Sequence, residues 1–116
     1  MLAGKYNIVC DQGSSFTRTL EIQTSDGEVF SLVGYTARME VRRTLDASTA
    51  IVSLTTANGR ISINGALGVI TLTLTASETA AITQSGVYDL EIVKTATGEV
   101  YKVVRGDFKL EKEVSR

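Results

Sequence analysis

The stretch YTARMEVRR, residues 35–43, alternates apolar and polar side chains along its length. On one side of an extended chain lie its apolar members, Tyr35, Ala37, Met39 and Val41. On the other side lie polar members, Thr36, Arg38, Glu40 and Arg42. A period of two is typical of a β-strand with one face in a core and the other in water. The stretch therefore favours a sheet protein whose strands are solvated on one side.

The same alternation recurs along the chain between turn residues. The strands that it predicts span residues 5–10, 16–23, 28–32, 35–43, 50–55, 60–64, 69–75, 87–94 and 99–114. Asp26-Gly27 and Asn58-Gly59 are hairpin signals, because these residues tolerate the left-handed conformations of tight turns. Short strands separated by such turns are typical of an antiparallel sandwich or small barrel.

Two segments depart from the alternation. Residues 76–82 have helix character, and we expect a short helix there, with Ser77 as its N-cap and Ile82 plugging the core. In the last run, Val103 is out of register with the other apolar residues, which predicts a β-bulge near Arg105 and Gly106. The sequence therefore predicts about eight or nine strands and one short helix.

The composition agrees with a sheet protein. Thr, Val and Ile make up 35 of the 116 residues, and these β-branched residues favour strands. A chain of this size buries roughly two-thirds of its unfolded surface, which is enough for one core. Because there is no Pro, there is also no stiff linker along which the chain would divide. We expect a single β-sandwich domain over residues 1–116.

Several chemistries are excluded by what the sequence lacks. It has no His and one Cys, which removes the usual general base, the commonest metal ligand and any internal disulfide. We assign no catalytic, cofactor-binding or metal-ligating residue and expect no enzyme. A net charge of -1 without a basic stripe argues against nucleic acid as a partner. Nor does any run reach the roughly 18 apolar residues that span a bilayer, so no membrane association is expected.

Three stretches resemble small β-sandwich proteins encoded among the tail and baseplate genes of tailed bacteriophages and prophages. They are YNIVCDQG at residues 6–13 followed by Phe16, LVGYTARM at residues 32–39, and GVYDLE at residues 86–91. In that family a threonine commonly stands where this chain has Val33, a small departure because both residues are β-branched. More distantly, the chain is similar to the N-terminal domains of siphophage baseplate upper proteins.

This resemblance implies an immunoglobulin-like antiparallel β-sandwich with a structural role in a virion. The implied role is a collar or baseplate subunit, or an adaptor for fibres, and it carries no catalytic residue. The expected partners are other phage tail or baseplate proteins, and further copies of the chain in the assembled particle. Residues 1–5 lack the pattern of a signal peptide, which agrees with synthesis in the cytoplasm of the bacterial host.

The candidate interface residues are Arg38, Glu40, Arg42 and Arg43. Guanidinium groups on a rigid strand favour bidentate pairing with carboxylates across an interface. The alternative is that these charges solubilise the strand or protect a sheet edge from pairing.

Other polar residues have structural interpretations. Cys10 ends an apolar strand and is expected to be a small core residue rather than a reactive thiol. Three aspartates that a calcium site would use lack the dense spacing of a calcium loop and suit turns instead: Asp11, Asp26 and Asp107. Asp89 and Glu91 are expected on a solvated strand face rather than as a catalytic pair.

Two functions follow as hypotheses. The first is a non-enzymatic structural protein of a phage tail that acts through protein–protein assembly. The alternative is a receptor- or carbohydrate-binding module, which predicts exposed aromatic rings in loops or a dependence on calcium. The sequence offers Tyr6, Tyr88 and Tyr101 as the candidates, although Tyr88 falls on the core side of its strand.

Overall fold

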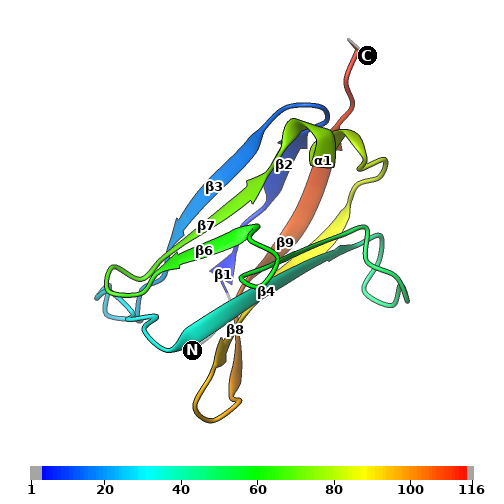
Figure 1. Cartoon of the computed structure of the whole chain (residues 1–116). Helices are drawn as coiled ribbons and strands as arrows, with labels where there is room; N and C mark the ends of the chain where they lie inside the picture. Colours follow the sequence, from blue (N-terminus) through cyan, green and yellow to red (C-terminus); the bar gives the residue numbers. More distant parts are fainter. Residues whose placement is uncertain (1–3, 115–116) are drawn as a thin grey trace.

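The computed structural model describes residues 4–114, so both ends of the domain expected over residues 1–116 lie outside the described residues. Within this part, nine strands form two sheets that lie face to face, and there is one short helix (Figure 1). The six-stranded sheet has the order β1-β9-β8-β4-β5, with β2 also paired to β9, and the three-stranded sheet has the order β3-β7-β6. The elements are β1 (Gly4–Lys5), β2 (Ile8–Asp11), β3 (Phe16–Glu21), β4 (Tyr35–Arg42), β5 (Val52–Thr55), β6 (Ile61–Asn64), β7 (Val69–Leu74), α1 (Ala76–Ala80), β8 (Gly86–Lys94) and β9 (Val100–Glu111).

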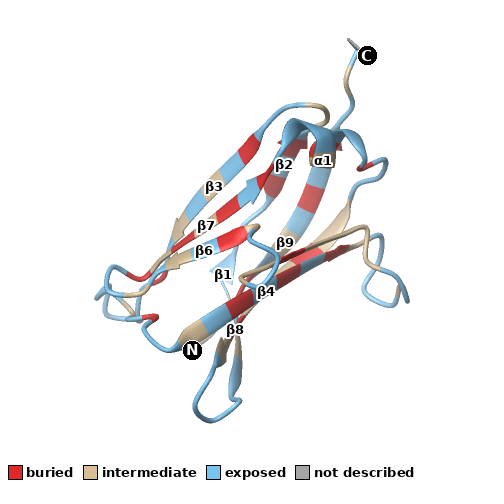
Figure 2. Ribbon diagram, in the orientation of Figure 1, coloured by how far each residue is buried: buried red, intermediate tan, exposed pale blue. Residues whose placement is uncertain are grey.

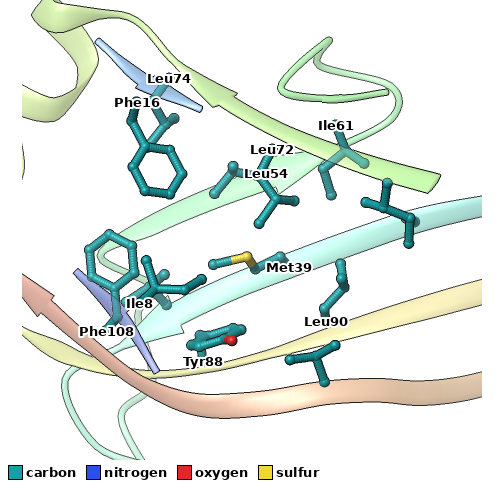
Figure 3. Close-up of a cluster of buried hydrophobic side chains, with 14 of the residues drawn as sticks. Ile8, Phe16, Met39, Leu54, Ile61, Leu72, Leu74, Tyr88, Leu90 and Phe108 are labelled. Carbon is teal, nitrogen blue, oxygen red and sulfur yellow. The ribbon is translucent and has the colours of Figure 1, made fainter. Parts of the chain in front are cut away.

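The apolar faces of the two sheets meet in a buried core (Figure 3). Met39 and Leu54 from the six-stranded sheet and Leu72 from the three-stranded sheet are at most 1% exposed. Phe16 and Phe108 add an aromatic pair across the sheets, with ring centroids 6.5 Å apart. Along β4, buried and exposed residues alternate as the sequence predicts (Figure 2). Burial of each large apolar side chain contributes about 1.5–3 kcal/mol, so this alternation holds the sheets together.

The sandwich is antiparallel, as predicted, except at one edge. Both β1 and β2 run parallel to β9. After β2 the chain crosses to the other sheet and forms β3, whereas a hairpin would have returned it along its own sheet. The direction in which a four-residue strand pairs is set by this crossing, and the alternation of its side chains carries no information about it.

The strand predicted over residues 28–32 does not form. One isolated bridge joins Val29 to Gln23, and the segment forms no strand of either sheet. Leu32 is 1% exposed, and its N–H donates to the Gly65 carbonyl at 2.8 Å. The apolar residues of this segment therefore anchor a connection between the sheets.

The short helix forms within residues 76–82 as predicted, but it ends at Ala80 and its N-cap lies two residues before the predicted one. The N-cap is Thr75, whose hydroxyl accepts from the Glu78 N–H, while the Glu78 carboxylate accepts from the Thr75 N–H. This reciprocal capping box excludes the predicted cap, Ser77, because the glutamate must stand three residues after the cap. Ile82 follows the helix and is 3% exposed, which confirms its place in the core.

The β-bulge lies earlier than predicted. The register between β8 and β9 shifts between Leu90 and Glu91, which pair with Val104 and Lys102 and leave Val103 as the extra residue. Both Val103 and Val104 are buried, which explains the break in the alternation. At the predicted position, Gly106 instead allows the backbone at Tyr6 to approach β9 closely, because a side chain on Gly106 would collide with the Tyr6 carbonyl.

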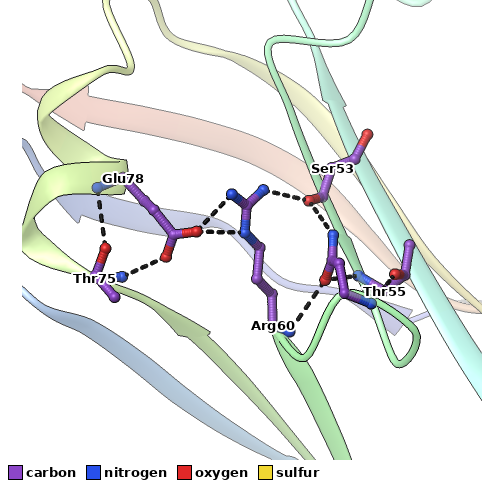
Figure 4. Close-up of polar contacts among 6 residues, drawn as sticks. Ser53, Thr55, Arg60, Thr75 and Glu78 are labelled. Carbon is purple, nitrogen blue, oxygen red and sulfur yellow. Dashed lines mark hydrogen bonds and ion pairs between the residues drawn. The ribbon is translucent and has the colours of Figure 1, made fainter.

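Two arginines form hydrogen bonds that join elements at the two sides of the sandwich, where the sheets are not paired with each other. On one side, Arg18 of β3 donates to the Val9 carbonyl of β2 at 2.7 Å, and its guanidinium lies 4.9 Å from the centre of the Phe16 ring. On the other side, Arg60 donates to the Ser53 carbonyl of β5 at 2.9 Å and to Glu78 of α1 at 2.6 Å (Figure 4). Each arginine therefore links elements that the sheet hydrogen bonds leave separate.

Candidate interaction face

The outward side of β4, β8 and β9 carries the greatest concentration of paired charges. We call it the charged face and define it by Arg38, Glu40, Arg42, Val87, Asp89, Glu91, Lys102, Arg105 and Asp107. Alternation on β4 places every second residue here, and the pairing of the strands aligns these residues in rows. Arg38 stands opposite Glu91, and Glu91 stands opposite Lys102. Neighbouring strands therefore present opposite charges to one another.

Three ion pairs fix the geometry of the charged face. Arg38 Nε lies 2.8 Å from Glu91 Oε1, Lys102 Nζ lies 3.2 Å from Asp89 Oδ2, and Arg42 Nη2 lies 3.1 Å from Glu40 Oε1. Glu40 and Asp89 are directly opposite each other, and Arg42 and Lys102 offset the repulsion between them. Exposed pairs of this kind contribute about 0–1 kcal/mol each. Their main effect is to hold the charges in fixed positions.

Three of the four predicted interface residues lie together on this face. Arg38, Glu40 and Arg42 all belong to β4. Arg43 follows the last residue of β4, is exposed, and belongs to the loop before β5. Arg42 also donates to the Ala47 carbonyl at 2.9 Å, which ties this loop to the sheet.

The same loop places an apolar side chain beside the charges. Leu45 is 86% exposed and borders two hollows of the charged face. One hollow, of about 290 Å³, is lined by Glu40, Arg42, Leu45, Val87, Tyr88, Asp89, Glu91, Lys102 and Arg105. The other, of about 260 Å³, is lined by Lys5, Leu45, Val87, Tyr88, Arg105, Gly106 and Asp107.

Leu45 and the β9 charges are absent from the residues predicted from sequence. An isolated leucine in the polar connection after Arg43 was a signal for Leu45. Arg105 and Asp107 gave no comparable signal, because their orientation depends on the position of the bulge.

The remaining candidates take structural places. Asp89 and Glu91 lie on an outward face, as predicted, and each forms an ion pair. Cys10 is fully buried, as predicted, and burial raises the pKa of its thiol. Between residues 4 and 114, no group of three or more His, Cys, Asp or Glu is arranged to hold a metal ion.

The aromatic candidates differ in exposure. Tyr6 is 40% exposed, and Tyr88 is 5% exposed, with its hydroxyl donating to the Tyr6 carbonyl. Tyr101 is partly buried, and its hydroxyl donates to Glu99 Oε2 at 2.9 Å. The hydrogen bond to Glu99 is the main reason that the pKa of Tyr101 is raised. These three rings therefore do not form an exposed aromatic platform.

Another hollow lies between β5 and α1. It has a volume of about 480 Å³, and Arg60 and Glu78 line it together with Val52 of β5 and the apolar residues 50–51 and 81–82, which precede β5 and follow α1. The two charged groups already bind each other. The pKa of Glu78 is lowered, chiefly by the hydrogen bond from the Thr75 N–H and further by Arg60. This arrangement stabilises the junction between α1 and β5.

In the described part of the chain, the helix α1 is not long and apolar enough to cross a membrane.

Comparisons with known proteins bear on the fold. No protein-family model matches the chain, and no curated protein matches it. Among solved structures, the chain is similar to the natural killer cell receptor Nkp44, described as a triggering partner in natural cytotoxicity. The TM-score is 0.51 at 16% identity, and the match covers 96% of this chain and 100% of that one. At this identity the likeness shows the fold alone: the chain is an all-β, immunoglobulin-like sandwich.

Proposed function

We propose that this protein is a non-enzymatic structural component of a phage or prophage tail, in the baseplate, the collar or a fibre adaptor. It acts by docking to other tail proteins or to further copies of itself, and the charged face is the docking surface. In this proposal the protein is made in the bacterial host cytoplasm and ends in the virion.

The observation that carries the proposal is the fixed charge pattern of the charged face. Its ion pairs join Arg38 to Glu91 and Lys102 to Asp89 on adjacent strands of one sheet. A rigid surface loses little conformational entropy when it docks, and fixed charges select a complementary partner. Leu45 supplies an exposed apolar side chain beside these charges. Together these features suit specific protein–protein contact.

The assignment to a phage tail is supported by the resemblance of residues 6–13, 32–39 and 86–91 to tail and baseplate proteins. In the structure, these stretches supply β2, most of β4 and the first part of β8.

The alternative function is recognition of a receptor or a carbohydrate. The fold is shared with a receptor, but fold alone does not determine function. Carbohydrate recognition commonly needs exposed aromatic rings, and of the three tyrosines considered above, Tyr6 is the exposed one. Assembly is therefore the better supported function.

The proposal is tested by following the protein into particles. Phage or prophage-derived particles are purified by density gradient, and their proteins are identified by mass spectrometry. The purified chain is then mixed with each recombinant tail and baseplate protein from the same genome, and the mass of the products is measured by light scattering after size exclusion.

We expect the chain in the particles and a mixed complex with at least one tail protein. A chain that is absent from particles, forms no such complex and binds glycans on an array would contradict the assignment and favour the alternative.

A further inference from the structure

Arg105 and Asp107 are oppositely charged and lie two residues apart on the outward side of β9. At the same spacing, Glu40 and Arg42 form an ion pair at 3.1 Å, and Lys109 and Glu111 form one at 3.2 Å. Neither the Arg105 nor the Asp107 side chain makes an ion pair or hydrogen bond with any residue between 4 and 114. The charged face therefore retains one cation and one anion without a partner.

These two residues border the hollow next to Leu45. Arg105, Asp107, Val87 and Leu45 all line the hollow of about 260 Å³. Leu45 is 86% exposed, so most of its apolar surface is in contact with water. An exposed leucine beside a hollow with an apolar side chain is an arrangement that a partner surface could cover.

The charged face as a whole is balanced in charge. Its cations are Arg38, Arg42, Lys102 and Arg105, and its anions are Glu40, Asp89, Glu91 and Asp107. A surface with equal numbers of both charges, a protruding side chain and a hollow has the features needed to match a copy of itself. In a twofold contact, residue i meets residue j and residue j meets residue i, so one such patch supplies both halves.

We propose that the charged face docks against the charged face of a second copy of this chain about a twofold axis. Arg105 pairs with Asp107 of the second copy, and Asp107 pairs with its Arg105. Leu45 of each copy enters the hollow of the other beside Val87. This inference rests on the proposed function, because it identifies the partner of the same surface.

Each contact has a physical role in the dimer. The reciprocal Arg105–Asp107 pairs set the register, since a shifted or reversed contact would oppose like charges. Leu45 supplies the apolar burial, because its exposed side chain leaves water when it enters the hollow of the second copy. The three internal ion pairs remain formed, so the surface needs little rearrangement when it docks.

The test is sedimentation equilibrium of the purified chain over a wide concentration range. We expect a reversible dimer whose dissociation constant rises at least tenfold in Leu45→Ser and in Arg105→Asp. The exchanged variant Arg105→Asp/Asp107→Arg keeps the net charge and recreates both reciprocal pairs, so its dissociation constant returns toward that of the unchanged chain. Val33→Ser removes a side chain that is 69% exposed outside the charged face, and it leaves the dimer unaffected.

Thermal unfolding of every variant shows whether the fold is retained. If Arg105→Asp alone unfolds, then Leu45→Ser and the exchanged variant still decide the matter. A chain that stays monomeric at millimolar concentration, or an exchanged variant as weak as the single variant, overturns the dimer. A monomer that still forms complexes with tail proteins overturns this inference and leaves the proposed function standing.

Discussion

The two outer faces of the sandwich are built on the same alternation but carry different chemistry. The charged face presents cations and anions held in ion pairs. The outer face of the three-stranded sheet presents hydroxyls, and we call Thr17, Thr19, Ser62, Thr71 and Thr73 the hydroxyl face. They too lie in register, Thr17 beside Thr73 and Thr19 beside Thr71, and all but the partly buried Thr71 are exposed.

This difference indicates that the hydroxyl face serves the fold and that the charged face serves the proposed function. Threonine satisfies the steric preference of a strand and is soluble, so the hydroxyl face stabilises its sheet without fixed polar contacts. The charged face places long side chains in definite positions at little gain in stability. The fold does not require these charged side chains to be held in fixed positions. We therefore assign the contacts with partner proteins to the charged face.

The largest expected effect comes from the core that supports both faces. Leu72 and Thr71 are neighbours on β7, but Leu72 is fully buried and Thr71 belongs to the hydroxyl face. Leu72→Ala is expected to lower the free energy of unfolding by about 2–5 kcal/mol, because it leaves a cavity between the sheets. Thr71→Ala is the matched control and is expected to change it by less than about 1 kcal/mol. Denaturant unfolding measures both, and equal effects would contradict the assignment of the two faces.

A smaller effect is expected where the N-terminal strands join the six-stranded sheet. Tyr88→Phe removes the hydroxyl that donates to the Tyr6 carbonyl and is expected to cost about 1 kcal/mol, since one partly buried hydrogen bond is lost. Hydrogen exchange should increase in β1 and β2 and stay unchanged in the three-stranded sheet. Tyr101→Phe is the control, because its partner Glu99 is exposed to water. Unchanged exchange in β1 and β2 would show that this hydrogen bond does not hold them.

The same tyrosine predicts a dependence on pH. Burial raises the pKa of Tyr88 above its ordinary value of 10.0. Above that pH the folded protein retains a proton that the unfolded chain has lost, so stability falls as the pH rises. Below it, both states are protonated and the contribution is constant. The unfolding free energy measured from pH 8 to 11 should decline less in Tyr88→Phe than in the unchanged chain, and identical slopes would contradict this role.

A further effect concerns the edge of the six-stranded sheet. The Asn58 side chain donates to the Ser53 carbonyl at 3.1 Å and accepts from the Thr55 N–H at 3.0 Å, so it occupies the free edge of β5. Asn58→Ala is expected to cost about 1 kcal/mol and to increase aggregation by exposing that edge. Asn64→Ala is the control, because that side chain makes one contact of 3.4 Å. Light scattering during storage measures aggregation, and equal rates in the two variants would contradict the protective role.

The smallest effect compares the two faces directly. A double-mutant cycle of Arg38→Gln and Glu91→Gln is expected to give a coupling energy of up to about 1 kcal/mol that weakens with salt. The matched cycle of Thr19→Val and Thr71→Val is expected to give a coupling independent of salt. A salt-dependent coupling on the hydroxyl face, or none on the charged face, would remove the distinction between them.

The sequence predicts most of the strands, because alternation depends on local pattern and burial, although residues 28–32 form none. The inward side of residues 35–43, the helix near residues 76–82 and the buried Cys10 all follow from it. The parallel pairing of β2 and the crossing at Leu32 depend on the path of the chain between sheets, which no local pattern specifies. Thr75 was missed as the N-cap, although its capping box with Glu78 was present in the sequence.

The candidate site was partly predictable for a related reason. Arg38, Glu40 and Arg42 share one regular strand, so their common face follows from their spacing. Arg105 lies on that face because the bulge at Val103 comes before it and shifts the alternation by one residue, so that both Lys102 and Arg105 point outward. A bulge shifts every later side chain by one position, and its exact place depends on contacts with the neighbouring strand.

The central claim is that the charged face, and not the hydroxyl face, mediates assembly. The most direct measurement is incorporation into purified tail particles of two variants, Glu40→Lys/Glu91→Lys and Thr19→Lys/Thr71→Lys. Both add lysines to neighbouring strands of one sheet, and mass spectrometry gives the copy number of each in the particles. We predict that the charged-face variant is lost from particles while the hydroxyl-face variant is retained. Loss of the hydroxyl-face variant with normal incorporation of the charged-face variant would contradict the account.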